Sequence, residues 1–368
     1  MPTSPADASE DASRQRGPRP LALYLARAGA GGDASRFAAF VDGLKAYWRH
    51  PRIGPPAPRA ELWRAGSARL LDCGGAGGLP VLMVPSLVNR AYVLDLMPGR
   101  SLAEALAQGG LRPLLLDWGA PDTAERHFDI ARYVDERLMP ALRLCATLDP
   151  RPPVLLGYCM GGLLALAAAS RKVRLGGIAL LATPWDFVAA RSLQPLPTPL
   201  AVGGLVATTT SLGEVPVSLL DWGFGLMDPD RVVARFAAFA TLAPGSDEAR
   251  GFIAVEDWLG DGVPLAGPVA RECVEDWYGA NQPARGRWRV AGTPVRPERL
   301  ELPAFVALPR ADQIVPHASA APLARLLANA TVVEPPCGHV GMVAGRRATV
   351  HLWQPLVAWL RRIALGQL

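Results

Sequence analysis

The chain has 368 residues, half of them hydrophobic, and a formal net charge of +5 that arginine carries almost entirely. This length and apolar content predict a folded protein with a large core. The arginines form no basic stripe and no nucleic-acid-binding motif. No apolar run approaches the roughly 20 residues that a membrane-spanning helix needs. We therefore expect neither nucleic-acid binding nor a membrane-spanning helix.

The N-terminal part differs in composition from the rest of the chain. Residues 1–20 are rich in Ser, Asp, Arg and Pro, which predicts a disordered tail without the apolar segment of a secretory signal. Residues 21–60 are predicted to form a helical arm. The five cysteines are scattered without metal-binding spacing, so no metal site is expected. A reactive thiol needs a reducing compartment, which favours the cytoplasm.

From residue 61 onward, apolar runs and helical periods alternate. This alternation predicts an α/β fold with a mostly parallel sheet covered by helices on both faces. Residues 61–184 and 301–368 are assigned to this core. Between them, residues 185–300 lose the periodicity and accumulate Pro, Gly and Trp, as expected for an inserted cap. Strands are predicted near 81–84, 113–117, 153–157, 177–181, 302–308 and 330–334, and helices over 101–109, 129–148, 160–171, 318–328 and 346–363.

One short motif indicates chemistry. A strand runs into Gly157-Tyr-Cys159-Met-Gly161, and a helix follows. This is the nucleophile-elbow pattern of α/β-hydrolases, with cysteine in place of serine. The glycines leave room for the neighbouring strand and helix, and the positive end of the helix favours a thiolate. Free cysteines are often buried and inert, so a structural cysteine is the alternative.

The acid and the base are expected downstream, in that order. Asp312 follows the strand 302–308, and His339 lies between glycines in the loop after the strand 330–334. Because loops after parallel strands gather at one edge of the sheet, we predict a triad of Cys159, Asp312 and His339. Asp186, which follows the strand 177–181, is the rival acid. The other histidines are predicted to lie at the surface or on helices: His50, His127, His317 and His351.

Two backbone amides are expected to stabilise an oxyanion. On this architecture one belongs to the residue after the nucleophile, here Met160. The other comes from the loop after the strand that ends at Pro85, near Val88. This assignment rests on position alone, because backbone donors leave no mark in a sequence.

Two further segments carry structural predictions. Arg90 is expected to pair with Asp95 near the start of a helix. The alternation of arginines around Trp288 predicts an exposed edge strand.

Several ordered motifs carry a family resemblance. From about residue 60 to the end, the chain resembles the polyhydroxyalkanoate synthases of the α/β-hydrolase superfamily, and among them the short catalytic subunits of the class III type. The resemblance rests on Leu87–Leu96, Leu114–Gly119, the Gly-Tyr-Cys-Met-Gly-Gly box, Asp312-Gln-Ile-Val-Pro316 and Gly338-His339-Val-Gly341.

The resemblance implies an acyltransferase that polymerises 3-hydroxyacyl-coenzyme A through an acyl-cysteine and releases coenzyme A. It implies no cofactor other than the coenzyme A of the substrate. A second synthase subunit or a homodimer is the implied partner, and the cytoplasm at polyhydroxyalkanoate granules is the implied location.

Three positions depart from the family pattern. Gln313 stands where the family has histidine, Cys337 stands where it has glycine, and His317 occupies a position that is often aromatic or acidic. These residues lie in the two loops that shape the site. A thioesterase or polyester depolymerase with water as acceptor therefore remains an alternative, and a non-catalytic granule-associated paralogue is a second one.

Overall fold

The computed structural model describes residues 16–53, 58–171, 173–189 and 211–368. Most of the predicted tail and part of the predicted cap lie outside these ranges. The chain divides into two compact units, one formed by residues 1–54 and 221–261 and the other by residues 55–220 and 262–368. The interval predicted as a cap thus contributes to both units.

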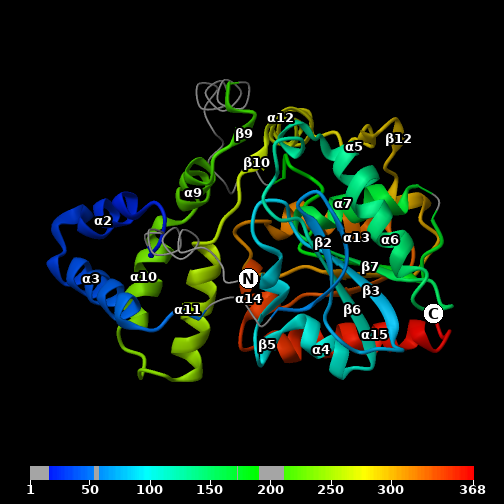
Figure 1. The fold of residues 1–368 in the computed structure, drawn as a ribbon. Helices are drawn as coiled ribbons and strands as arrows, with labels where there is room; N and C mark the ends of the chain where they lie inside the picture. Colours follow the sequence, from blue (N-terminus) through cyan, green and yellow to red (C-terminus); the bar gives the residue numbers. More distant parts are fainter. Residues whose placement is uncertain (1–15, 54–57, 172, 190–210) are drawn as a thin grey trace, which may run out of the picture. The chain divides into compact units, whose positions relative to one another are not determined.

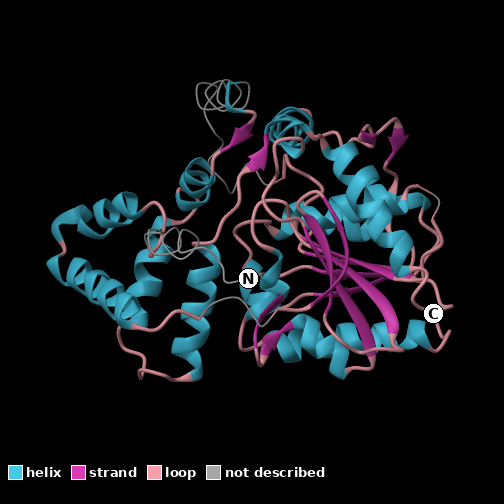
Figure 2. Cartoon of the chain, in the orientation of Figure 1, coloured by secondary structure: helices cyan, strands magenta, loops and turns pink. Residues whose placement is uncertain are grey.

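The larger unit contains an eight-stranded sheet in the order β1-β2-β6-β3-β7-β8-β13-β14, drawn in magenta in Figure 2. The strands from β6 to β14 are parallel, and β1 and β2 add an antiparallel edge. The predicted, mostly parallel sheet is confirmed. Its strands are β1 (Ala60–Ala65), β2 (Ala68–Asp72), β3 (Leu79–Val84), β6 (Leu111–Asp117), β7 (Val154–Tyr158), β8 (Gly177–Leu181), β13 (Ala304–Ala307) and β14 (Ala330–Val333).

Helices cover both faces of this sheet, as predicted. Figure 1 shows α4 and α15 on one face and α5, α6 and α7 on the other. All ten residues of α7 are buried, which explains why its sequence is apolar on every side. The helices that flank the sheet are α4 (Leu102–Gln108), α5 (Ile130–Tyr133), the π-helical turn η4 (Val134–Leu138), α6 (Met139–Cys145), α7 (Met160–Ala169), α13 (His317–Leu326), α14 (His339–Ala344), the π-helical turn η7 (Thr349–Trp353) and α15 (Gln354–Ala364).

Short elements complete this unit, and one of them corrects a prediction. Trp288 is only 1% exposed, so the expected exposed edge strand around it is wrong. Its indole packs edge-on against Trp185 and Trp277, with ring centroids 6.4 and 5.6 Å away. The short elements are η2 (Ala91–Leu94), β4 (Asp95–Met97), β5 (Arg100–Ser101), η3 (Glu125–His127), β9 (Glu214–Val215), β10 (Leu265–Ala266), α12 (Gly267–Glu272), η5 (Cys273–Gly279), β11 (Arg289–Val290), β12 (Thr293–Pro294) and η6 (Pro297–Arg299).

The smaller unit is helical and has its own aromatic core. Phe236 makes edge-to-face contacts with Phe40, Tyr47 and Phe252 at 5.1–5.9 Å between ring centroids. Gly43 lets two of its helices approach closely, because a Cβ there would lie 1.9 Å from the Phe236 carbonyl oxygen. Its helices are α2 (Leu21–Gly29), η1 (Ala30–Gly32), α3 (Ala34–Arg49), α10 (Pro229–Phe239) and α11 (Asp247–Leu259), and α9 (Val217–Gly225) crosses the boundary between the units.

Among the described residues, no helix combines the length and the apolar character needed to cross a bilayer.

Candidate active site

Cys159 stands at a strained turn between strand β7 and helix α7. Its φ of 56° and ψ of −128° are rare for a residue other than glycine. Its backbone amide donates to the Leu181 carbonyl at 2.8 Å, which ties the turn to the end of β8. Strain of this kind costs about 1–3 kcal/mol and concentrates at functional positions. The thiol is partly exposed, so a substrate can reach it.

The glycines around Cys159 are required by space. A Cβ at Gly157 would lie 2.4 Å from the Gly162 Cα, and a Cβ at Gly161 would lie 2.0 Å from the Val84 carbonyl oxygen. At Gly162 the added atom would lie 1.8 Å from the Thr183 hydroxyl. Real side chains do not tolerate these approaches, so the strand, the turn and the helix can pack together only around glycines.

Asp312 and His339 form a buried pair. His339 Nδ1 and Asp312 Oδ2 are 2.7 Å apart. The other carboxylate oxygen, Oδ1, accepts hydrogen bonds from the backbone amides of Ile314 and Val315 at 2.8 and 2.9 Å. Asp312 lies in the loop after β13, as predicted, whereas His339 is the first residue of α14 rather than part of a loop. The carboxylate is therefore fixed by its own loop before it orients the imidazole.

The imidazole of His339 also interacts with the Cys159 side chain. Burial of the ring opposes protonation, but the charges of Asp312 and Cys159 outweigh it and raise the pKa of His339 to about 10. The ring of Tyr158 lies beside the imidazole, with centroids 4.9 Å apart. The structure thus brings the three predicted triad residues together.

Asp186, the rival acid, is engaged elsewhere. Its Oδ1 accepts from the amides of Val188 and Ala189 and from the Asn281 side chain, each at 3.0 Å. These bonds hold the turn after β8. The carboxylate that contacts His339 is the one on Asp312.

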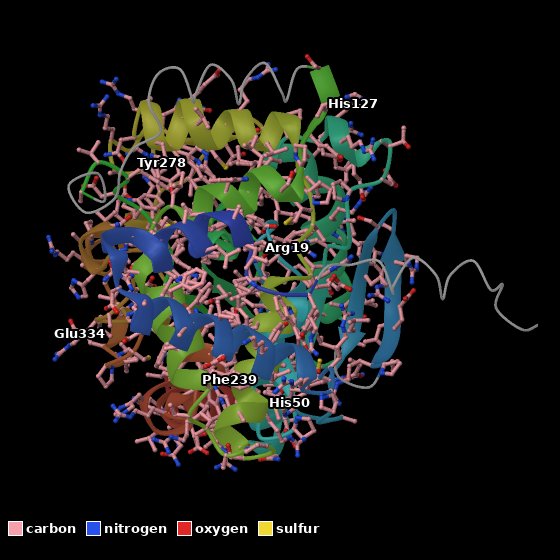
Figure 3. The ribbon with its side chains drawn as sticks, turned by 90° about the vertical axis from the view of Figure 1, so that its left-hand side faces the viewer. Arg19, His50, His127, Phe239, Tyr278 and Glu334 are labelled. Carbon is pink, nitrogen blue, oxygen red and sulfur yellow. The ribbon has the colours of Figure 1, made fainter. Side chains whose placement is uncertain are left out.

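The remaining histidines have other surroundings. His127 is exposed and His50 is half-buried at the end of α3, and both are labelled in Figure 3. His317 begins α13 and pairs with Glu334 at 3.3 Å. His351 is half-buried in η7.

The two amides predicted to form an oxyanion hole differ in their surroundings. Met160 is the first residue of α7, where helix geometry leaves the amide without an intrahelical acceptor. The Val88 amide donates to the Ser86 hydroxyl at 3.2 Å. Binding of an oxyanion at Val88 would require that bond to be shared or broken, so the assignment of Val88 stays a prediction.

Asp95 has two partners that the sequence does not predict. Both of its carboxylate oxygens bond to Arg59, at 2.8 and 2.9 Å, and Ser101 donates to it at 2.6 Å. Arg59 lies 36 residues from Asp95, so local spacing does not predict this pair. The pairing of Arg90 with Asp95 stays a prediction.

The acid loop and the histidine loop are joined by backbone bonds that sequence reasoning missed. The Ala311 amide donates to the Cys337 carbonyl at 3.1 Å, and the Arg310 amide donates to the Pro335 carbonyl at 2.9 Å. Burial raises the pKa of the Cys337 thiol, assisted by the charge of Asp312. Cys337 thus contributes its carbonyl to the scaffold of the site.

Among the described residues, no group of three or more His, Cys, Asp or Glu side chains is arranged to hold a metal ion.

Comparison with known proteins gives the family. The family model of the alpha/beta hydrolase fold matches residues 80–345. The chain is 30% identical over 292 residues to the poly(3-hydroxyalkanoate) polymerase subunit PhaC of Haloferax mediterranei, covering 76% of this chain and 58% of that protein. For the proteins of the same name from Haloarcula marismortui and Allochromatium vinosum, identity is 26% and 27%, with 78% and 77% of this chain and 62% and 80% of theirs covered.

The chain therefore spans about three fifths of the length of the two haloarchaeal relatives and a larger share of the third. The matches to these relatives cover about three quarters of the chain, and the family model spans all three residues of the buried Cys–His–Asp array. The chain belongs to the alpha/beta hydrolase fold family, and the relatives to which it is similar are poly(3-hydroxyalkanoate) polymerase subunits.

Proposed function

We propose that this chain is the catalytic subunit of a polyhydroxyalkanoate polymerase, which joins 3-hydroxyacyl units from coenzyme A thioesters into a polyester. The observation that carries the proposal is the placement of Cys159 on a nucleophile elbow, where its side chain interacts with the hydrogen-bonded pair of His339 and Asp312. It occurs in a chain whose curated relatives are polymerase subunits.

In the first half-reaction, the Cys159 thiolate attacks the carbonyl carbon of the thioester. The amide of Met160, at the positive end of α7, stabilises the oxyanion that forms. The bond between this carbon and the coenzyme A sulfur then breaks. The imidazolium of His339 gives its proton to the departing sulfur, so coenzyme A leaves as a thiol and an acyl-cysteine remains.

In the second half-reaction, the hydroxyl group of another acyl unit or of a chain end attacks the acyl-cysteine. The neutral imidazole of His339 accepts the hydroxyl proton as the new ester bond forms. The bond to the Cys159 sulfur breaks, and the thiolate and imidazolium are restored. Asp312 holds the imidazole in one orientation through both steps and stabilises its positive charge.

The same proposal covers partners and place. The relatives are named as polymerase subunits, which supports a second subunit or a second copy as partner of this chain. We place the reaction in the cytoplasm at the surface of the growing polymer. The chemistry needs no cofactor beyond the coenzyme A that the substrate carries.

The test uses the purified full-length chain with 3-hydroxybutyryl-coenzyme A, with and without a candidate second subunit. Coenzyme A release is followed by chromatography, and the acyl product is analysed separately. Cys159→Ala should abolish release. Cys145→Ala, which removes a fully buried thiol from α6, serves as the matched control and should retain it.

Each outcome separates the candidates. Polymer as product supports the proposal. Free 3-hydroxybutyrate instead assigns the chain to the thioesterases or depolymerases. Coenzyme A release by Cys159→Ala at the parent rate, or no release under either condition, would overturn the proposed function.

A further inference from the structure

The imidazole of His339 has an aromatic neighbour, Tyr158. This tyrosine is the last residue of β7 and directly precedes Cys159 in the chain. Its ring centroid lies 4.9 Å from that of the imidazole, and the two ring planes are tilted by 34°. Two rings at this distance and tilt overlap in part, because rings that lie side by side in one plane would have their centroids further apart. The face of the tyrosine therefore covers part of one face of the imidazole.

A second contact joins the same two residues. The Tyr158 hydroxyl donates to the backbone carbonyl of His339 at 3.4 Å. Burial raises the pKa of this hydroxyl well above its ordinary value, as do the charges of Cys159 and Asp312, so the phenol keeps the proton that it donates. The backbone of Tyr158 is paired with β8 in the central sheet, and its hydroxyl bonds to the first residue of α14. The ring is thus held at both ends against the imidazole.

The burial of both rings decides what the contact can do. Tyr158 is 3% exposed and His339 is 8% exposed, so the tyrosine offers no surface to a substrate and acts through the histidine. A cation over the face of an aromatic ring, within about 6 Å of its centroid, is attracted by the negative π face, and the attraction grows when both groups are desolvated. The imidazolium form of His339 is such a cation, whereas the neutral imidazole is not. The contact therefore favours the protonated state of the base.

We propose that Tyr158 is a positioning residue for the base: its ring stabilises the imidazolium of His339 through a cation–π contact, and its hydroxyl fixes the backbone from which the imidazole projects. Asp312 holds the imidazole at its Nδ1 edge, whereas Tyr158 covers its face, so the two contacts fix the ring in different directions. The inference rests on the proposed function only in taking His339 to be the group that moves the proton.

Other charges lie near the same imidazole, and a change confined to the ring of Tyr158 leaves them in place. The titratable and charged groups that face the imidazole or lie on the segments around α14 are Cys159 at the elbow, Asp312 in the loop after β13, Cys337 in the loop before α14, Tyr92 in η2, Arg100 in β5, Arg347 after α14 and His351 in η7.

The test is an NMR titration of His339 in the full-length chain with ¹³C-labelled histidine rings. All proteins carry Cys159→Ala, because the thiol titrates as well and the charge of Cys159 raises the pKa of His339. The chain has five histidines, and the signal of His339 is the one that His339→Gln removes. The parent is compared with Tyr158→Phe and with the monofluorinated and trifluorinated forms of that phenylalanine, introduced by nonsense suppression. Fluorine withdraws negative charge from the ring face while the ring keeps its shape.

The fluorinated series separates the charge of the ring from its packing. Tyr158→Phe should leave the pKa of His339 within about 0.3 pH unit of the parent value, because the ring remains. The trifluorinated ring should lower that pKa by about 0.5–1 pH unit and the monofluorinated ring by less. Tyr158→Leu, which removes the ring, should lower it at least as far as the trifluorinated ring does.

Tyr133→Leu is the matched control. Tyr133 is also a buried tyrosine of the larger unit, at 4% exposed, but its ring contacts Trp118 and Phe128. This variant should leave the pKa of His339 unchanged, and thermal unfolding checks that each protein is folded. A pKa of His339 that does not move across the fluorinated series would overturn the inference, whether or not Tyr158→Leu folds.

Coenzyme A release separates this inference from the proposed function. With Cys159 restored, Tyr158→Leu should lower kcat for 3-hydroxybutyryl-coenzyme A by about tenfold with little change in KM, whereas Tyr158→Phe should stay within about threefold of the parent. Release by a folded Tyr158→Leu protein at the parent rate would overturn the positioning role. If the parent releases no coenzyme A while the fluorinated series lowers the pKa of His339, the proposed function fails and the contact between Tyr158 and the imidazolium stands.

Discussion

Replacing Asp312 by asparagine tests the array most directly, because the structure determines how the new side chain must lie. Oδ1 of Asp312 accepts from the Ile314 and Val315 amides, so an asparagine at this position must keep its oxygen there. Its NH2 group then points at His339 Nδ1, where the carboxylate oxygen lay at 2.7 Å. The asparagine NH2 group and a protonated Nδ1 are both donors, so they cannot form a hydrogen bond with each other. The imidazole is forced into the tautomer that carries its proton on Nε2.

That tautomer cannot accept a proton from Cys159. The charge-assisted hydrogen bond that is lost contributes about 1.5–3 kcal/mol, which corresponds to roughly 10- to 150-fold in rate. The reversed tautomer adds to this loss, as it does in triads of the same design. We expect Asp312→Asn to slow coenzyme A release from 3-hydroxybutyryl-coenzyme A by about 10²- to 10⁴-fold with little change in overall fold.

Two other aspartates make the result interpretable. Asp117→Asn, at the end of β6, also alters a carboxylate that accepts a hydrogen bond from a backbone amide, that of Gly119. Its rate of coenzyme A release should stay within threefold of the parent rate. Asp186→Asn should lower the rate of coenzyme A release by less than about tenfold, since the Asp186 carboxylate holds a turn. If Asp186→Asn proved inactive and Asp312→Asn fully active, the assignment of the acid would be refuted.

Three further outcomes are expected. Gly161→Ala should lower the free energy of unfolding by about 1–3 kcal/mol or more, because the new methyl group would overlap a backbone oxygen of β3. Gly223→Ala in α9 is the control and should not destabilise the fold, because the space around that residue is open. Thermal unfolding compares the two variants. The pKa of His339 is raised to about 10 in the folded state, from about 6.5 in the unfolded state. Protonation of His339 therefore stabilises the folded protein fully below about pH 6.5, and this stabilisation is lost as the pH rises toward 10. Denaturant unfolding across that range should show the decline, and His339→Gln should flatten it. Glu125→Gln should lower the free energy of unfolding in urea by about 3–5 kcal/mol, because it removes the fully buried carboxylate that bonds to the largely buried Arg137 at 2.8 Å and leaves that guanidinium only the partly exposed Glu136, at 3.8 Å. A loss below about 1 kcal/mol would contradict this.

The parallel core could be predicted because its strands, apart from the edge strand β14, are buried on both faces and therefore appear as continuous apolar runs. The antiparallel edge formed by β1 and β2 could not be predicted in this way. The exposed and half-buried positions of β1 mix charged and apolar residues without a clear period, and β2 is only five residues long. The same limit applies to Trp288: the arginines around it alternate, but alternation does not show that the indole fills a space between Trp185 and Trp277.

The helical unit depends on contacts between distant parts of the chain. Residues 221–261 group with the N-terminal helices rather than with the rest of the interval predicted as a cap. The close crossing at Gly43 and Phe236 joins positions almost 200 residues apart, and a glycine in a helix shows no partner in the sequence. The N-terminal helices fall within the predicted helical arm, whereas α10 and α11 lie in the interval predicted as an irregular cap and were not expected.

Within the site, order and spacing predict which side chains lie together, but they do not predict the groups that hold those side chains in place. One departure from the family pattern, Cys337, falls at a position where the backbone supplies part of the geometry. Cys337 joins the two loops through its carbonyl, while Asp312 is held by the amides of Ile314 and Val315. The side chain at position 337 can therefore change while these backbone bonds persist. The array of thiol, imidazole and carboxylate therefore survives in a chain that departs from its family at the residues directly beside it.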